Sequence, residues 1–128
     1  MNSDEVEKWI RIAAGDLKVA KKLFVPYDET EGSFICFHLQ QCCEKYIKAF
    51  LIYKDSEVEK IHNLFYLQQK AKQFNNELEK FDFKNLNDFA VQFRYPGEDI
   101  LPDKEEIKYY IDLCENLQKF DLTLLLNN

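Results

Sequence analysis

Residues 33–54, SFICFHLQQCCEKYIKAFLIYK, decide the fold, because apolar side chains recur along them at spacings of three and four with no Gly or Pro. This spacing places the side chains on one face of a helix. The face is unusually wide, and a wide apolar face is typical of a helix buried on most sides. We therefore expect residues 33–54 to form the central helix of the protein. The apolar residues are Ile35, Cys36, Leu39, Cys42, Cys43, Tyr46, Ile47, Ala49, Phe50 and Tyr53.

Breaks in the helical pattern are few. The 128-residue chain has only 3 Gly and 3 Pro, and most of them fall in residues 26–32 and 96–102. Gly and Pro are the strongest local interruptions of a helix. The remaining pattern predicts helices over residues 4–25, 33–54, 61–80, 85–95 and 103–126, the last with a capping box from Asp103 to Glu106. We expect one all-α domain over residues 1–128, an up-and-down four-helix bundle with an additional short helix.

Composition excludes several classes of protein. Hydrophobic residues make up 46% of the chain, too many for a disordered protein. No apolar run approaches the roughly 20 residues of a membrane span, and the first residues do not resemble a signal peptide. The net charge of −6 provides no overall positive field, so binding of nucleic acid would need a local patch. We expect a cytoplasmic protein that does not associate with membranes.

The four cysteines, Cys36, Cys42, Cys43 and Cys114, all map to apolar helix faces. A zinc site needs four converging ligands, and the sequence has no Cys-x-x-Cys or His-Glu-x-x-His motif. A nucleophilic thiol needs an exposed, electropositive setting. We therefore expect four buried free thiols that pack as small apolar groups, with no metal and no other cofactor.

Polar residues suggest one candidate ligand site. His38, Gln41, Lys45 and Lys48 line one edge of the helix predicted over residues 33–54. His62 opens the next helix, where exposed backbone N–H groups favour an anion. Arg and Lys side chains bind phosphate. These residues are candidate contacts for a nucleotide phosphate, and a solvated helix surface is the alternative interpretation.

Several large apolar residues fall outside the main stripes or at their margins. They would form a patch that binds a second subunit. The alternative is that they belong to the core and that the stripes are wider than the spacing suggests. The residues are Phe34, Phe37, Ile52, Tyr66, Tyr109, Leu125 and Leu126.

Four pieces of the chain, in order, resemble the HEPN family (higher eukaryotes and prokaryotes nucleotide-binding). Residues 37–51, FHLQQCCEKYIKAFL, resemble the family's central helix, which typically reads F-x-x-Q-Q-A-x-E-K-x-L-K-A. Residues 61–64, IHNL, resemble the T-H-D-L that opens its next helix. Residues 16–23 resemble the first helix, and residues 93–96, FRYP, resemble the R-Y-P near the end of the fourth. The match spans nearly the whole chain.

The resemblance implies a helical bundle that forms a homodimer. Many family members act beside a minimal nucleotidyltransferase in two-component or toxin–antitoxin systems. Others are metal-independent ribonucleases with an Arg that is followed, after a few residues, by a His. Here Arg94 is followed by YPGEDIL, without a His.

Three functions follow from these observations. In the first, the protein is a nucleotide-binding or nucleotidyltransferase-partner subunit, with anion contacts from Lys45, Lys48, His62 and Arg94 and base stacking on Tyr95. In the second, it is a ribonuclease toxin that uses Arg94. In the third, it is an interaction subunit without a ligand. Part of the polar pattern is explained structurally, because Glu44 and Lys48 would form an exposed i, i+4 ion pair.

Overall fold

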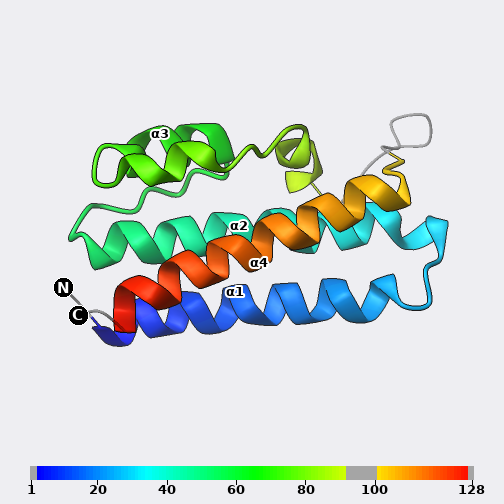
Figure 1. Ribbon diagram of the computed structural model, residues 1–128, viewed down its shortest axis with the longest axis horizontal. Coiled ribbons are helices and arrows are strands. Elements are labelled where there is room, and N and C mark those ends of the chain that lie inside the picture. The colour runs from blue at the N-terminus through cyan, green and yellow to red at the C-terminus, as the bar shows by residue number, and fades with distance from the viewer. Residues whose placement is uncertain (1–2, 92–100, 127–128) are drawn as a thin grey trace.

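The computed structural model describes residues 3–91 and 101–126, and this part of the chain is all-helical, as predicted. It has four α-helices, with short 3₁₀ helices in the connections (Figure 1). The α-helices are α1 (Ser3–Phe24), α2 (Gly32–Tyr53), α3 (Leu64–Lys72) and α4 (Lys104–Leu126). The 3₁₀ helices are η1 (Glu29–Glu31), η2 (Asn76–Lys80) and η3 (Leu86–Ala90).

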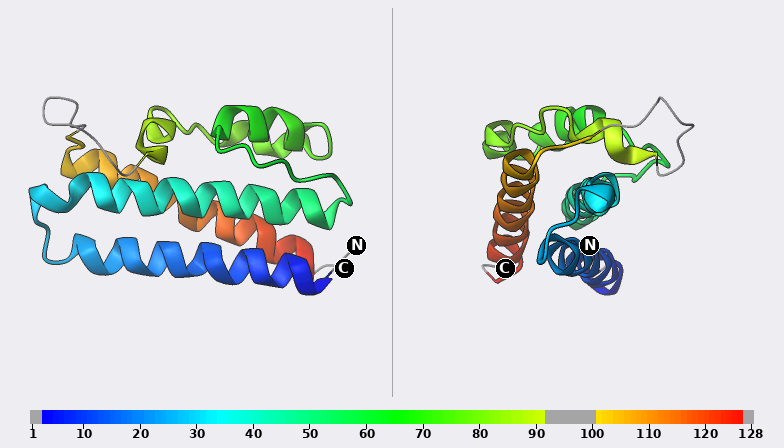
Figure 2. Two further views of the ribbon diagram at one scale, coloured as in Figure 1. Left: turned by 180° about the vertical axis from the view of Figure 1, so that it is seen from behind. Right: turned by 90° about the vertical axis from the view of Figure 1, so that its right-hand side faces the viewer.

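Helix α2 is the centre of the fold. Helix α1 runs antiparallel to α2, whereas α4 lies across both and runs in the same general direction as α2 (Figure 1). Helix α3 and the 3₁₀ helices η2 and η3 lie on the far side of α2 from α1 (Figure 2). Helix α2 therefore packs against α1, α4, α3 and η3, which agrees with its wide apolar face.

The periodicity of the long helices predicts their buried faces correctly. Helix α1 buries four apolar residues at helical spacing, and α2 buries nearly the whole of its wide face. In α4 the side chains of Tyr110, Leu113 and Leu117 are buried, and those of Phe120 and Leu124 pack at the edge of the core. The buried stripe residues of α1 are Val6, Ala13, Leu17 and Ala20.

The prediction of one helix over residues 61–80 is wrong. Helix α3 spans only Leu64–Lys72, and η2 follows after a turn. The reason is the buried side chain of Gln68, whose Nε2 donates to the carbonyls of Leu78 (2.9 Å) and Phe81 (2.7 Å). A buried amide needs such partners. Because a continued helix would carry these carbonyls away from Gln68, the chain folds back instead.

The predicted helix over residues 85–95 is also shorter than expected. The structure has η3 over Leu86–Ala90, and residues 92–95 lie outside the described part of the chain. Leu86 and Phe89 are both buried. A 3₁₀ helix has three residues per turn, so it brings residues three apart to the same side. The tight turn therefore lets both side chains pack against α2.

The segment that leads into α2 at Gly32 meets Pro102, before α4, at one end of the bundle. A Cβ at Gly32 would lie 3.2 Å from Pro102 Cγ and 3.3 Å from the Tyr27 hydroxyl. The Tyr27 hydroxyl donates to the Pro102 carbonyl at 3.4 Å. Glycine therefore allows the two connections to approach closely here.

The capping prediction for α4 holds in one direction. Asp103 Oδ1 accepts from the Glu106 N–H at 2.7 Å. The Glu106 carboxylate accepts a bond from the Tyr110 hydroxyl at 3.0 Å.

The residues at the margins of the stripes divide between core and surface. Ile52 is buried, and Phe34 and Tyr66 are 47% and 41% exposed. The Tyr109 hydroxyl donates to the Asp82 carbonyl at 2.6 Å. Phe74, which follows α3, is 44% exposed because the chain turns away there.

All four cysteines are free and buried, as expected. Burial raises the pKa of the Cys36 thiol to about 12 and also raises the pKa values of the Cys42, Cys43 and Cys114 thiols. Cys114 Sγ lies 3.3 Å from Cys43 Sγ, between α2 and α4. These thiols are packing groups of the core.

Among the described helices, none is both long enough and apolar enough to cross a membrane.

One carboxyl group in the core should make the stability of the protein depend on pH. Asp121 on α4 is only 4% exposed, and its Oδ2 has no hydrogen-bond partner among the described residues. Burial raises its pKa well above the ordinary value. The free energy of unfolding therefore falls as the pH rises from the unfolded-state pKa through the native one, because only the unfolded state loses its proton freely.

Replacement of Asp121 by Asn removes this ionisation. We expect Asp121→Asn to raise the free energy of unfolding at neutral pH by on the order of 1 kcal/mol or more. The advantage should shrink as the pH falls toward the ordinary pKa of an aspartate. Urea unfolding of both proteins across this pH range measures the difference, and parallel curves would contradict the assignment.

Gly15 provides a second test of stability. It lies in the middle of α1, on the exposed side of the helix. A Cβ at this position would meet nothing within 4 Å. Alanine is favoured over glycine in a helix interior by about 1 kcal/mol. We expect Gly15→Ala to raise the free energy of unfolding by about this amount in urea titrations. A loss of stability would show that the backbone at Gly15 is not regular helix.

Candidate functional site

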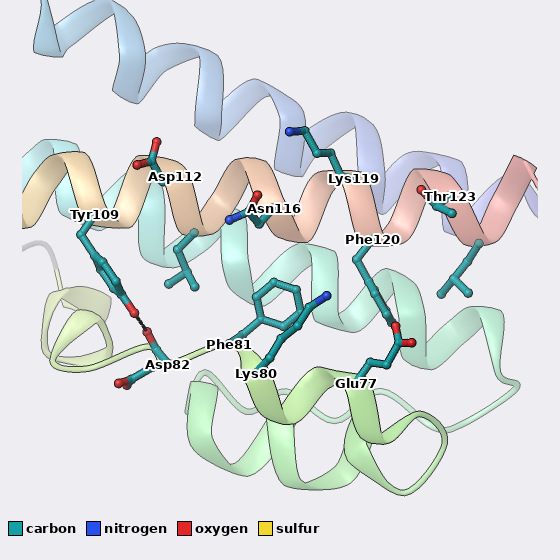
Figure 3. A pocket seen from close by; sticks show the side chains of 12 residues that line it. Glu77, Lys80, Phe81, Asp82, Tyr109, Asp112, Asn116, Lys119, Phe120 and Thr123 are labelled. Carbon is teal, nitrogen blue, oxygen red and sulfur yellow. Dashed lines mark hydrogen bonds between the residues drawn. The ribbon is translucent and has the colours of Figure 1, made fainter.

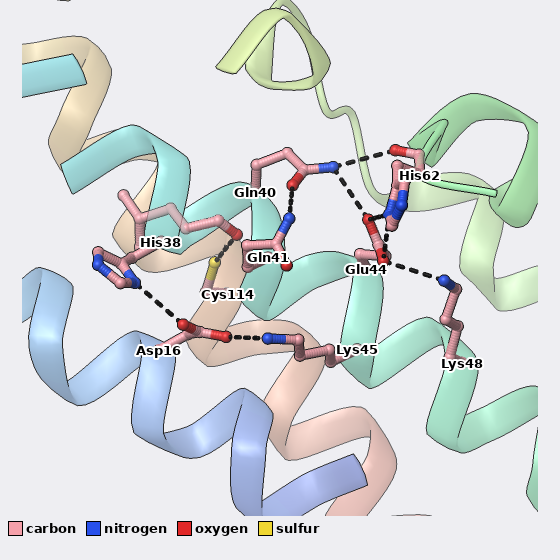
Figure 4. A network of polar contacts seen from close by, with 10 residues as sticks. Asp16, His38, Gln40, Gln41, Glu44, Lys45, Lys48, His62 and Cys114 are labelled. Carbon is pink, nitrogen blue, oxygen red and sulfur yellow. Dashed lines mark hydrogen bonds and ion pairs between the residues drawn. The ribbon is translucent and has the colours of Figure 1, made fainter. Parts of the chain in front are cut away.

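The polar edge of α2 divides into two clusters (Figure 4). In the first, Asp16 of α1 binds two residues of α2. Its Oδ1 lies 3.0 Å from His38 Nδ1, and its Oδ2 accepts from Lys45 Nζ at 2.8 Å. The Asp16, Lys45 and His38 side chains are 14%, 20% and 26% exposed. The charge of Lys45 is thus balanced within the fold.

The second cluster is centred on Glu44 (Figure 4). One carboxylate oxygen accepts from Lys48 Nζ at 3.0 Å. His62 Nδ1 lies 3.1 and 3.0 Å from the two carboxylate oxygens. The Glu44 and Lys48 side chains are 3% and 4% exposed, whereas that of His62 is 67% exposed. A buried ion pair therefore supports an exposed imidazole.

The expectation of an exposed Glu44–Lys48 pair is wrong. The pair lies in the interior, and the Lys48 ammonium is also 5.7 Å from the centroid of the Trp9 ring. The spacing of four residues predicts the contact but not its burial, because Trp9 comes from α1. In such a buried pair, loss of either partner leaves an uncompensated charge in the core.

Gln40 binds the backbone at His62. Its Nε2 donates to the His62 carbonyl at 3.0 Å, and its Oε1 accepts from Gln41 Nε2 at 2.8 Å. Gln40 is fully buried. Helix α2 thus fixes both the carbonyl and the ring of His62.

Asparagine side chains occupy the N-terminus of α3. His62 precedes the helix, and Asn63 is the N-cap, whose Oδ1 accepts from the Tyr66 N–H at 3.0 Å. Asn87 Oδ1 accepts from the Leu64 N–H at 2.9 Å. The expectation that this terminus offers its N–H groups to an anion is therefore wrong for these two donors.

The structure does not bring the predicted site residues together as one cationic edge. Lys45 points to Asp16, Lys48 points to Glu44, and each lysine is bound to a carboxylate. His62 is the exposed member of the three. Arg94 and Tyr95 lie outside the described residues.

The exposed ring of His62 is the part of the cluster that can bind a ligand or exchange a proton. When the Nδ1–H donates to Glu44, Nε2 is the free nitrogen of the imidazole. A neutral ring accepts a proton there, and a protonated ring donates a hydrogen bond to an anion. Sequence reasoning missed the roles of Gln40 and Asp16. The signal for Gln40 is its position between apolar neighbours, at i−4 from Glu44.

Among the residues described, no three His, Cys, Asp or Glu side chains are grouped closely enough to hold a metal ion.

A large hollow lies away from this cluster, between α4 and the segment around η2 (Figure 3). It measures about 690 Å³. Phe81, Leu113 and Phe120 form an apolar lining, and the lysines Lys80 and Lys119 lie at its rim with acidic side chains. The groove therefore has room for a small ligand, but Lys45, Lys48 and His62, the predicted ligand residues that the structure describes, do not line it.

Comparison with known proteins supports the resemblance seen in the sequence. No curated protein matches the chain at a significant level. The HEPN domain matches residues 6–123, nearly the whole chain, and includes the α2 and His62 segments that carry the motif. The bundle around α2 is thus the helical fold of that domain, and the chain belongs to the HEPN domain family.

Proposed function

We propose that the protein is the binding subunit of a two-component system. It recognises the phosphate of a nucleotide or RNA at His62 and pairs with a minimal nucleotidyltransferase. Membership of the HEPN family supports this class of function. The observation that carries the ligand site is the exposed His62 ring, which both oxygens of the buried Glu44 hold.

The buried charges favour a ligand role for His62. Burial of Glu44 and Lys48 requires desolvation of both groups, and an apolar pair of similar size often serves stability as well. Fixed rotamers supported by buried hydrogen bonds are characteristic of sites that bind or react. Lys48 balances the charge of Glu44, so the carboxylate orients the ring without making the cluster negative. A protonated His62 then adds a positive charge that favours phosphate.

The other predicted residues enter the proposal in different roles. Lys45 and Lys48 act as supports, because each is bound to a carboxylate. Arg94 and Tyr95 remain proposed contact and stacking residues on the basis of the sequence. We also propose a homodimer, on the basis of the family resemblance.

Ligand binding can be tested by thermal unfolding with nucleoside mono-, di- and triphosphates and short RNA. A ligand at 100 times its dissociation constant stabilises the protein by about 2.7 kcal/mol. We expect His62→Gln to reduce this stabilisation and His38→Gln to preserve it. The control is matched, because His38 Nδ1 also lies 3.0 Å from a carboxylate oxygen, that of Asp16.

Equal stabilisation of the wild type and the His62→Gln variant would contradict the His62 site. Loss of stabilisation in Lys119→Ala instead would place the ligand in the groove beside α4.

A second candidate function, metal-independent RNA cleavage, is favoured by the orientation of the same ring. With Nδ1 bound to Glu44, Nε2 could accept the proton of a ribose 2′-hydroxyl. The 2′-oxygen would then bond to phosphorus, the bond to the 5′-oxygen would break, and that oxygen would take up a proton. The products are a 2′,3′-cyclic phosphate and a 5′-hydroxyl.

For this candidate, we expect a labelled single-stranded RNA to be cleaved in the presence of a chelator. Cleavage should be lost in His62→Gln and retained in His38→Gln. Intact RNA after long incubation with concentrated wild-type protein would exclude it and leave the binding proposal unaffected.

A further inference from the structure

The outward face of α1 carries a cationic stripe, defined here as Arg11, Lys18 and Lys22. All three are exposed, and among the described residues none of them has an ion-pair partner. With Gly15 they follow the spacing 11, 15, 18 and 22, which places them along one line of a helix. The other described elements lie on one side of α1 and leave its other side uncovered (Figure 2). The stripe is unusual in a protein whose net charge is −6.

Two apolar residues flank the stripe. Ile12 is 52% exposed and Val19 is 40% exposed, one on each side of Gly15 along the helix. On the other flank, a hollow of about 400 Å³ lies between α1 and α4 and is lined by Lys18, Lys22 and others. Lys21 also lines it, and its ammonium is bound to Glu115 at 2.9 Å. The face therefore combines exposed cations, exposed apolar groups and a hollow.

Gly15 lies at the centre of this face and has no role in the packing of the bundle. A Cβ there would meet nothing within 4 Å. Glycine within a helix reduces stability, and its use at a central exposed position fits close approach of another backbone. A backbone that approached Gly15 would have to come from outside the described fold.

Charge decides which partner fits. A second copy of α1, packed antiparallel about Gly15, would place Lys8 opposite Lys22 and Ile12 opposite Lys18. Like charges and mismatched polarity disfavour that pair. Single-stranded nucleic acid is usually held by aromatic stacking as well as by cations. The exposed neighbours of the stripe are Ile12 and Val19, which suit an apolar protein contact.

We propose that the outward face of α1 docks an amphipathic helix of a partner protein, with acidic side chains against Arg11, Lys18 and Lys22 and apolar side chains on Ile12 and Val19. The partner backbone crosses α1 at Gly15. This mode of recognition lays the apolar face of one helix on another, and the charges set its orientation. The surface lies on the opposite side of α2 from His62, so it stands independently of any ligand there.

The test uses two labelled synthetic peptides of about 20 residues, long enough for several helical turns. Both carry the same leucine stripe at helical spacing. One has glutamates beside the stripe, and the other has lysines. Fluorescence anisotropy with the full-length protein should show binding of the glutamate peptide alone. The affinity should fall as the salt concentration rises, since exposed charges are screened.

Three variants locate the surface. Lys18→Glu/Lys22→Glu should weaken binding of the glutamate peptide by about tenfold or more and allow the lysine peptide to bind. Lys104→Glu/Lys108→Glu makes the same change in net charge on α4 and should leave binding unchanged. Gly15→Ala should raise the melting temperature and still weaken binding. A purely structural glycine would not produce these opposite effects.

Three results would overturn the proposal. Equal loss of peptide binding in both double variants would show a nonspecific charge effect. Binding of a uridine oligonucleotide in place of the glutamate peptide, with loss in Lys18→Glu/Lys22→Glu, would assign the face to nucleic acid. A dimer in sedimentation that this same variant dissociates would assign the face to a second copy of the chain.

Discussion

Helix α2 carries Gln40, Glu44 and Lys48 into an apolar interior, and each of these polar groups must be bound there. They are spaced four residues apart, so they form one row on the helix. Lys48 and Gln40 bind Glu44 within the row, and Gln41 binds the Gln40 oxygen. The ring of His62 also binds Glu44, and its carbonyl accepts from Gln40. The cost of leaving buried polar groups unpaired thus fixes the chain just before α3.

This constraint also explains why the long helices are predictable and the rest is not. The apolar stripes of α1, α2 and α4 depend on local spacing, so their periodicity is visible in the sequence. The end of α3 depends on the Gln68 amide, which binds carbonyls of residues 78 and 81. Such a bond forms only after the chain has turned. No local propensity at Lys72 or Gln73 signals the end of the helix as strongly as that tertiary contact.

The candidate site shows the same limit. Spacing correctly places His38, Lys45 and Lys48 on one edge of α2, but it does not say what packs there. Asp16 and Trp9 of α1 cover part of that edge and turn two expected free cations into internal partners. The HEPN-like motif and the position before a helix both led to His62 in the sequence. The sequence does not show that the Glu44–Lys48 pair is buried, because the residues that cover it come from other elements.

The resulting distribution of charge separates lysines that serve the fold from cations that remain for partners. Lys45 and Lys48 are matched by Asp16 and Glu44, and their positive charge is therefore balanced before any ligand arrives. Folding leaves the stripe on the outside of α1 unmatched, beside a glycine that weakens the helix. Desolvation and pairing govern the first group, whereas the second remains hydrated and costs the fold little. Because hydrated charges mainly steer association, our proposal assigns partner selection to the surface of α1, whereas the buried row of α2 orients the exposed His62 ring.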